Sequence, residues 1–302
     1  MEKDSSFARG DIYTRVTNEI IQAIEAGVDE YRMPWHQRSG AGLPRNAATG
    51  NLYRGINNVA LWATSHLRGY ALPYWATYRQ WGKLGAQVRR GEKASIIVFY
   101  KQETPSATEE ENGDTKNSRR IVRASFVFNA QQVDGWPYPE PQGEDRTERL
   151  EKVDAFISSL GAEIRYGSDM AYYSKKFDRI HMPDRHDFMD RATGTATEGF
   201  YSVLLHEHLH WSGHPKRLSR DLSDRFGSDA YAMEELVAEL GAAFLCADLG
   251  ISVYPRRDHA AYVHSWLSVL RQQKTAIVGA AGAAMTACRY LGELVSKKER
   301  AA

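Results

Sequence analysis

Cysteine is scarce in this chain of 302 residues, which contains only Cys246 and Cys288. Two distant cysteines cannot form the disulfide framework of a small secreted domain, and their apolar surroundings indicate reduced core residues. Long hydrophobic runs are also lacking: the longest, residues 275–288, has 14 residues, mostly alanine and glycine, which is too short to cross a bilayer. Because the N-terminal residues contain no apolar signal region, we expect a cytoplasmic protein without a membrane partner.

A strong net charge is missing as well, since 39 lysines and arginines nearly balance 38 acidic residues and leave a net charge of +1. The balance is uneven along the chain. Residues 31–101 hold 11 basic residues, 11 aromatic residues and a single acidic residue, Glu92. Basic side chains contact phosphates and aromatic rings stack on unpaired bases, so this block predicts a groove for single-stranded DNA. The chain has no helix-turn-helix, zinc-finger or RNP motif that would indicate reading of a duplex.

The candidate DNA-contacting residues are the basic and aromatic side chains of two segments, residues 42–58 and 70–93. They are Arg45, Arg54, Trp75, Tyr78, Arg79, Trp81, Lys83, Arg89, Arg90 and Lys93. The alternative for the aromatic residues is that about half of them, Trp62 for instance, fill a small core.

The order of patterns predicts an α+β fold with two domains, each long enough for its own core. Apolar residues recur at helical spacing over residues 11–27, and Asn57 or Asn58 and Thr77 are candidate caps of two further helices. β-Branched and aromatic residues predict strands at 94–101 and 121–128. Later segments predict a helix at 146–160, three short strands (163–166, 171–174, 179–182) and four long helices (197–211, 231–249, 259–273, 276–296). Three prolines and a glycine in the intervening segment indicate a linker, which gives domains at residues 1–136 and 147–302 and a linker at 137–146.

The sharpest chemical motif is HEHLH at residues 206–210, which matches H-E-x-x-H. It lies in a helical pattern without glycine or proline, so His206 and His210 share one helix face and could hold one Zn²⁺. Glu207 lies beside them, where a carboxylate could take a proton from water that the metal has acidified. The same ligand set also suits Mn²⁺, Co²⁺ or Ni²⁺.

Two histidines do not complete a catalytic zinc site. The third histidine of a metzincin would be residue 216, which is a lysine. Downstream, Glu235 and Glu239 lie one turn apart on a predicted helix. We favour Glu235 as the ligand and Glu239 as the carboxylate that orients a ligand histidine, with the reverse assignment left open. Glu234 points about 100° away on the helix and is expected to be solvated.

Several segments of the first unit together resemble the N-terminal domain of the ArdC-type antirestriction proteins, which also occurs in plasmid-transfer primases. They are YTRVTNEIIQAIEAG (13–27), PWH (34–36), GLPRNAATGNLYRGIN (42–57), YWATYRQWGKLGAQVRRGEKASIIVFYK (74–101) and SFVFNAQQVDG (125–135). In the second unit, LLHEHLHWSGHPKRL (204–218) and YAMEELVAELGAAFL (231–245) resemble the zincin-like metallopeptidase domain that follows it in that family. The resemblance covers nearly the whole chain.

The resemblance implies a protein of a plasmid or other mobile element, active in conjugation, that binds single-stranded DNA and shields entering DNA from host restriction. It implies a metal role for His206 and His210, a ligand role for Glu235 and an acid–base role for Glu207. Some antirestriction proteins act as acidic DNA mimics, which a net charge of +1 and a basic block exclude here.

Three hypotheses follow. The first is a DNA-shielding protein that carries a zinc metallopeptidase domain. The second is an active DNA-directed protease that cleaves a DNA-bound host protein. The third is a binding module whose metal site is only structural.

Overall fold

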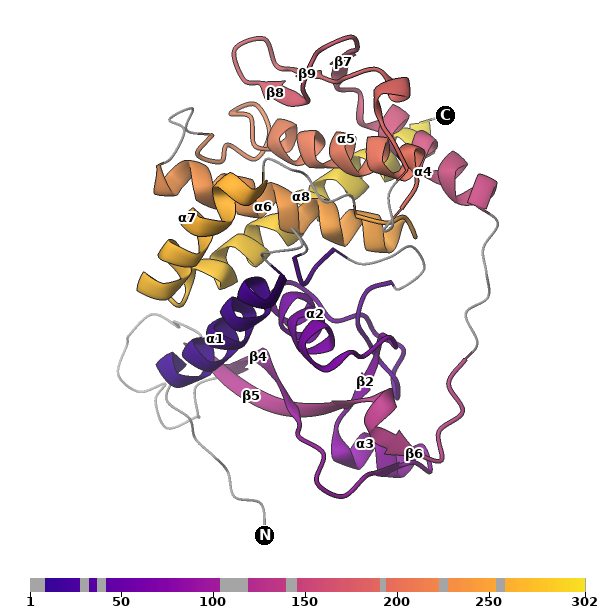
Figure 1. Ribbon diagram of the computed structural model, residues 1–302, viewed down its shortest axis with the longest axis vertical. Coiled ribbons are helices and arrows are strands. Elements are labelled where there is room, and N and C mark those ends of the chain that lie inside the picture. The colour runs from indigo at the N-terminus through magenta and orange to yellow at the C-terminus, as the bar shows by residue number, and fades with distance from the viewer. Residues whose placement is uncertain are drawn as a thin grey trace, which may run out of the picture.

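The computed structural model describes residues 9–27, 33–36, 42–103, 119–139, 146–190, 194–222, 228–253 and 259–301. Figure 1 shows a sheet at one end of the molecule, a small sheet at the other, and most of the helices between them. The fold is α+β, as the sequence predicts. In the described part of the chain, no helix is both long and apolar enough to span a membrane.

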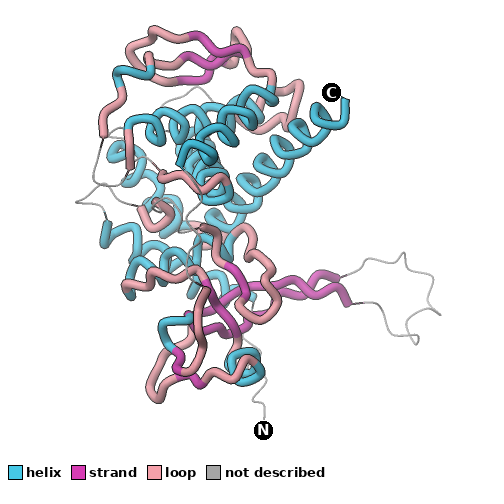
Figure 2. Tube along the Cα trace, turned by 90° about the vertical axis from the view of Figure 1, so that its right-hand side faces the viewer, coloured by secondary structure: helices cyan, strands magenta, loops and turns pink. Residues whose placement is uncertain are grey.

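The N-terminal unit packs two helices on a four-stranded sheet. The helices are α1 (Arg9–Gly27) and α2 (Ile56–Arg68). The sheet has the order β1-β2-β5-β4, built from β1 (Arg45–Asn46), β2 (Tyr74–Ala76), β5 (Arg119–Asn129) and β4 (Ser95–Glu103). The strands β4 and β5 pair antiparallel from Ser95↔Val127 to Glu103↔Arg119 and run out from the body of the molecule (Figure 2). The apolar positions that recur at helical spacing in α1, Ile12, Val16, Ile20 and Ile24, are all buried.

A smaller lobe follows the edge of this sheet. It contains α3 (Tyr78–Lys83), β3 (Gln87–Val88), the 3-10 turn η3 (Ala130–Gln132) and β6 (Val133–Asp134). Thr77 caps α3 as predicted, because its hydroxyl accepts from the Gln80 backbone N–H. The predicted cap of α2 is wrong: the helix starts one residue after Gly55, and Asn57 and Asn58 lie inside it. Asn57 instead bonds the backbone of Val98, which ties α2 to the sheet.

The C-terminal unit is mostly helical. It begins with α4 (Arg146–Leu160) and a three-stranded sheet of order β7-β9-β8, formed by β7 (Glu163–Arg165), β8 (Tyr172–Ser174) and β9 (Arg179–His181). After the turn η4 (Arg185–Asp187) come α5 (Ala196–Ser212), α6 (Asp229–Asp248), α7 (His259–Gln272) and α8 (Ala276–Ala301). The small sheet lies over α5, and α6 packs between α5 and α8.

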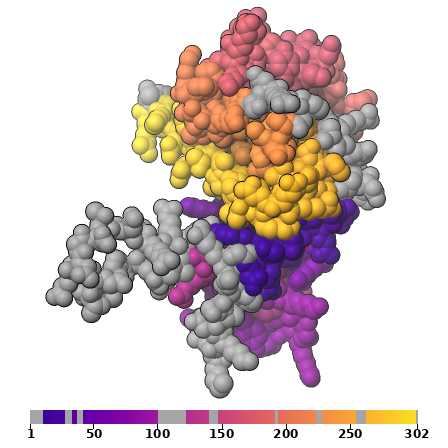
Figure 3. All heavy atoms as spheres, turned by 90° about the vertical axis from the view of Figure 1, so that its left-hand side faces the viewer, coloured from indigo at the N-terminus to yellow at the C-terminus, as the bar shows by residue number. Residues whose placement is uncertain are grey.

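The hydrophobic core does not divide at the segment predicted to be a linker. One cluster of buried residues runs from α1 and α2 of the N-terminal unit into α5–α8 of the C-terminal unit. The Trp62 ring lies 5.7 Å from that of Phe244, and the Trp35 ring lies 6.3 Å from that of Trp266. In Figure 3 the indigo atoms of α1 meet the golden atoms of α7, which are in contact. The two units, each long enough for a core of its own, therefore share their main core, because aromatic side chains of one unit pack against those of the other.

The two cysteines are free, with Cys246 fully buried, in agreement with the sequence. The predicted boundaries at residues 136 and 147 stay a prediction, and most of the segment between them lies outside the described residues.

Candidate metal centre

Helix α5 places the two motif histidines side by side. Thr195 and Glu198 form a capping box at its start, and its backbone turns end at Gly213. His206 and His210 lie one turn apart, so their Nε2 atoms come within 3.1 Å of each other. Both side chains are largely buried, and His210 keeps 13% of its surface exposed. The helix thus presents two imidazole nitrogens toward one point.

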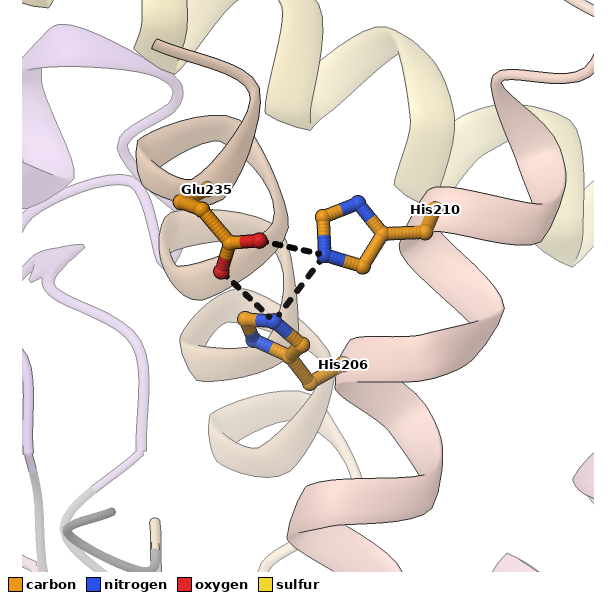
Figure 4. Close-up of side chains that lie close together, drawn as sticks. All are labelled: His206, His210 and Glu235. Atoms are coloured by element: carbon orange, nitrogen blue, oxygen red, sulfur yellow. Dashed lines mark hydrogen bonds and ion pairs between the residues drawn. The ribbon is translucent and has the colours of Figure 1, made fainter. Parts of the chain in front are cut away.

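Helix α6 supplies the third group. Ser228 caps it by accepting from the Tyr231 N–H, and the Glu235 carboxylate faces the two histidines (Figure 4). Its Oε2 lies 3.5 Å from His206 Nε2 and its Oε1 lies 3.5 Å from His210 Nε2. Tetrahedral ligands bonded to one zinc ion are about 3.3 Å apart. The ligand atoms of His206, His210 and Glu235 all lie within 4.8 Å of one another and could hold a metal ion.

The charges of this site favour a cation. Burial opposes charge on His210, yet the carboxylates of Glu235 and Glu234 raise its pKa to about 10. Burial also opposes the charge of Glu235, but the two histidines hold the pKa of this carboxyl well below its usual range. An ionised carboxylate beside two imidazoles is the donor set that zinc and its neighbours in the first transition row prefer.

Glu239 lies one turn beyond Glu235 and faces the other nitrogen of His206. Its Oε2 is 3.6 Å from His206 Nδ1. Its Oε1 accepts hydrogen bonds from His36 Nε2 at 2.6 Å and from Trp35 Nε1 at 3.2 Å. The sequence predicted Glu239 beside a ligand histidine, but it gave no sign of Trp35 and His36, which are some 200 positions away.

Glu234 is buried, which corrects the expectation of a solvated side chain. Its Oε1 lies 3.2 Å from His210 Nδ1, and both of its oxygens accept from Arg220, at 2.8 and 3.0 Å. Arg220 also donates to Ser212 and to the Leu209 carbonyl. The helix face that points away from the metal therefore meets an arginine delivered by the chain after α5. The angular position of Glu234 on its helix, which the sequence does indicate, gives no information about a partner from another segment.

Two other residues of the motif are buried as well. The His208 Nδ1–H donates to the Leu204 carbonyl at 2.8 Å, and burial lowers the pKa of His208 to about 4. It is a neutral residue off the metal face. Glu207 is only 2% exposed and precedes it on the same helix turn as the ligands.

The predicted DNA-contacting residues divide into two groups. The exposed ones are Arg45, Arg54, Tyr78, Arg79, Lys83, Arg89, Arg90 and Lys93. Trp75 and Trp81 are fully buried, so their assignment as stacking platforms is wrong. The Trp81 ring packs 5.1 Å from Trp136, and its Nε1 donates to the Phe128 carbonyl. These two rings are core residues, the alternative that the sequence left open for half of the aromatics.

A hollow of about 660 Å³ lies beside this basic surface, between α1, the end of α2 and the strands β4 and β5. Arg15, Arg68 and Lys93 line it, and the ring of Phe126 is 38% exposed there. The Glu19 carboxylate in the same wall accepts from the Thr64 hydroxyl. Arg15 and Phe126 were missed from the sequence, because a phenylalanine inside a strand pattern is expected to be core.

Each of the two units matches a family of known proteins. Residues 10–128 match the model of the N-terminal domain of the anti-restriction factor ArdC, and residues 151–283 match that of a zincin-like metallopeptidase. The metal-free crystal structure of the antirestriction protein ArdC from plasmid R388 is 39% identical, with a TM-score of 0.75 over 95% of this chain and 98% of that one. The chain belongs to the ArdC antirestriction family.

Other relatives of this ArdC-family chain differ in length and in bound metal. The Mn(II)-bound structure of R388 ArdC is 38% identical, with a TM-score of 0.73 over 94% of this chain and 98% of that one. The uncharacterized protein y4eC of Sinorhizobium fredii is 45% identical, over 96% of this chain and 94% of its own length. The DNA primase TraC of Escherichia coli is 38% identical over 89% of this chain, which spans only 26% of that protein.

Proposed function

We propose that this ArdC-family chain binds single-stranded DNA, protects incoming DNA from host restriction, and hydrolyses peptide bonds at a zinc centre in its C-terminal unit. The observation that carries the hydrolytic part is the convergence of His206, His210 and Glu235 at mutual distances of 3.1–3.5 Å. This is the three-ligand arrangement of catalytic zinc sites, which leave one position open.

His206, His210 and Glu235 would hold the ion. When bound, zinc polarises a substrate carbonyl and lowers the pKa of water to about 7. Glu207 is the general base: it takes a proton from the attacking water and returns it to the leaving amine. Glu207 is buried next to His206 on the helix that carries both ligand histidines.

The substitution Glu207→Gln tests the hydrolytic part, because it removes the base and leaves the metal ligands in place. We expect it to bind zinc with unchanged stoichiometry, measured by metal analysis after dialysis, and to lose at least 100-fold in casein or peptide hydrolysis. Equal hydrolysis by the variant and the unaltered protein would refute the role of Glu207. Full hydrolysis in excess chelator would refute the role of the metal.

The same variant separates the three hypotheses in a conjugation assay with a restricting recipient. Protection that survives Glu207→Gln means that DNA shielding suffices. Protection that is lost while DNA binding persists means that a host protein must be cleaved. If neither protein hydrolyses any substrate and both protect, the metal site is structural.

The DNA-binding part depends on the exposed basic residues and on the hollow lined by Arg15, Arg68, Lys93 and Phe126. Its volume of about 660 Å³ falls in the range of small-molecule sites. We propose that a base enters it against Phe126 while neighbouring phosphates contact the basic side chains.

Fluorescence anisotropy with labelled single strands tests this assignment. We expect Arg90→Glu and Lys93→Glu to weaken binding and to flatten its salt dependence, and Phe126→Ala to lose about 1–3 kcal/mol at every salt concentration. Lys297→Glu, an equal charge change on the exposed end of α8, is the control. An affinity independent of salt would contradict an electrostatic groove. Arg89 is a poor choice of variant, because it is paired with Glu92 and Asp134.

A further inference from the structure

A short segment of the N-terminal unit lies against the metal centre of the C-terminal unit. This segment is residues 33–36, of which Met33, Trp35 and His36 are all buried. Trp35 and His36 both donate to Glu239 Oε1, over a sequence separation of more than 200 residues. The side chain of Glu239 is only 3% exposed, so these bonds supply donors to a carboxylate that water hardly reaches.

The proton positions along this path are determined by the backbone. The Met33 N–H donates to His36 Nδ1 at 3.1 Å, so neutral His36 carries its proton on Nε2. That Nε2–H points at Glu239 Oε1, 2.6 Å away. His36 therefore acts as a donor to Glu239 without needing to be charged.

Glu239 transmits the constraint to a metal ligand. Its second oxygen, Oε2, lies 3.6 Å from His206 Nδ1, while His206 Nε2 faces Glu235. A histidine that binds metal through Nε2 must carry its proton on Nδ1. The Glu239 carboxylate, 3.6 Å from Nδ1 and therefore beyond hydrogen-bond distance, favours that tautomer electrostatically and leaves Nε2 for a metal ion.

We propose that Trp35 and His36 are positioning residues of the metal centre, which hold the Glu239 carboxylate in the orientation that prepares His206 to bind metal. The inference rests on the metal site and not on the peptidase activity or DNA binding proposed above. It makes the N-terminal unit a working part of a site whose ligands all come from the other unit.

The second histidine of the site offers an internal comparison. His210 Nδ1 faces Glu234, which Arg220 holds from within the C-terminal unit. Each ligand histidine thus has its own carboxylate, and each carboxylate has its own cationic or N–H donors. Among the residues that the structure describes, the donors to Glu239 come from the N-terminal unit, whereas Arg220, which holds Glu234, belongs to the C-terminal unit.

Metal affinity in the full-length protein tests the proposal. We would measure Zn²⁺ binding by competition with a chromophoric chelator, and record the visible spectrum of the Co²⁺-loaded protein, which reports ligand geometry. Loss of a partner of a ligand histidine typically weakens metal binding 10–100-fold. We expect His36→Ala, one step further out, to weaken it by about 10-fold and to shift the Co²⁺ bands. His36→Gln, which keeps an N–H donor for Glu239, should restore most of the affinity.

Two further variants separate positioning from general stability. Trp35→Phe removes one N–H donor while keeping an aromatic ring, and should weaken binding less than His36→Ala. His264→Gln, at an exposed position on α7, should change neither affinity nor spectrum. A merely structural role for His36 would lower the melting temperature of the metal-free protein and leave the spectrum of its folded fraction unchanged. That outcome, or wild-type Zn²⁺ affinity in folded His36→Ala and Trp35→Phe, would overturn the proposal.

Discussion

The buried Glu234 carboxylate contacts two side chains, the imidazole of His210 and the guanidinium of Arg220. Both of its oxygens are used by Arg220, and one of them also faces His210 Nδ1. The side chains of Glu234 and Arg220 are 8% and 13% exposed, so neither charge has water to replace a lost partner. Removing one member of a buried ion pair lowers stability by more than the pair's net contribution, because the other charge is left buried without a partner.

We therefore expect Glu234→Ala to lower the free energy of unfolding by about 3 kcal/mol, because it leaves the Arg220 charge buried beside uncharged partners. Urea denaturation in the presence of a chelator measures this without a contribution from bound metal. Glu293→Ala, at an exposed position on α8, is the control. A loss no larger than that of the control would show that solvent reaches Arg220.

At the scale of elements, a charged cluster ties the small sheet to the end of α5. Asp178 follows β8 and accepts from the Tyr173 hydroxyl at 2.8 Å and from Arg217 through both of its oxygens. The Arg217 guanidinium lies 3.9 Å from the ring centre of Trp211, on α5, and donates to the Trp211 carbonyl. The cluster keeps the hairpin of β8 and β9 in place over the helix that carries both ligand histidines.

This cluster predicts a dependence of stability on pH. Burial would raise the pKa of Asp178, but the hydrogen bonds from Arg217 and Tyr173 outweigh it and hold this pKa below its usual value. The pKa is thus lower in the folded state than in the unfolded state. Its contribution to stability is complete above the unfolded value of about 3.9 and disappears as the pH falls through the folded value.

Asp178→Asn isolates this charge, because asparagine tolerates the left-handed backbone at φ 51° that Asp178 adopts. We expect the variant to lose about 1–3 kcal/mol of unfolding free energy at pH 7 and to show a smaller decline than the unaltered protein between pH 5 and pH 2.5. Chemical denaturation across that range measures both effects. Asp169→Asn, an exposed carboxylate nearby in sequence, should leave the curve unchanged, and an equal decline in both variants would contradict the assignment.

Local patterns predicted most elements, since residue spacing and composition indicate helices such as α5 and α6 and the strands β4 and β5. They also predicted His206 and His210, because residues one turn apart share a face of a single helix, and they favoured Glu235 over Glu239 as the third ligand with the reverse left open. They did not predict Arg220 or Trp35 and His36, which reach the site from loops. No periodicity within a helix indicates which loop will fold against it.

For the whole molecule, the main difference from the expectation is the continuous core. A basic and aromatic N-terminal block suggested rings on the surface, yet Trp35, Trp62, Trp75 and Trp81 are all buried. Trp35 and Trp62 pack against aromatic rings of the C-terminal helices. Composition counts aromatic residues but does not show which of them the second unit will cover.

A continuous core predicts that the two units unfold together. We expect urea denaturation followed by far-ultraviolet circular dichroism and by tryptophan fluorescence to give one coincident transition. Trp62→Ala should shift it by about 3–5 kcal/mol in both signals, since the cavity opens at the contact between the units. Two separated transitions, with only the first shifted by Trp62→Ala, would contradict a shared core.

The contact of residues 33–36 with Glu239 sets a practical limit on dissecting this protein. A fragment that starts after the proline-rich stretch would keep all three candidate metal ligands and yet lose Trp35 and His36, the donors to Glu239. The Glu239 carboxylate would face solvent where the indole of Trp35 and the imidazole of His36 now lie. Anyone who transplants the zincin-like unit into another protein would need to graft those four residues as well.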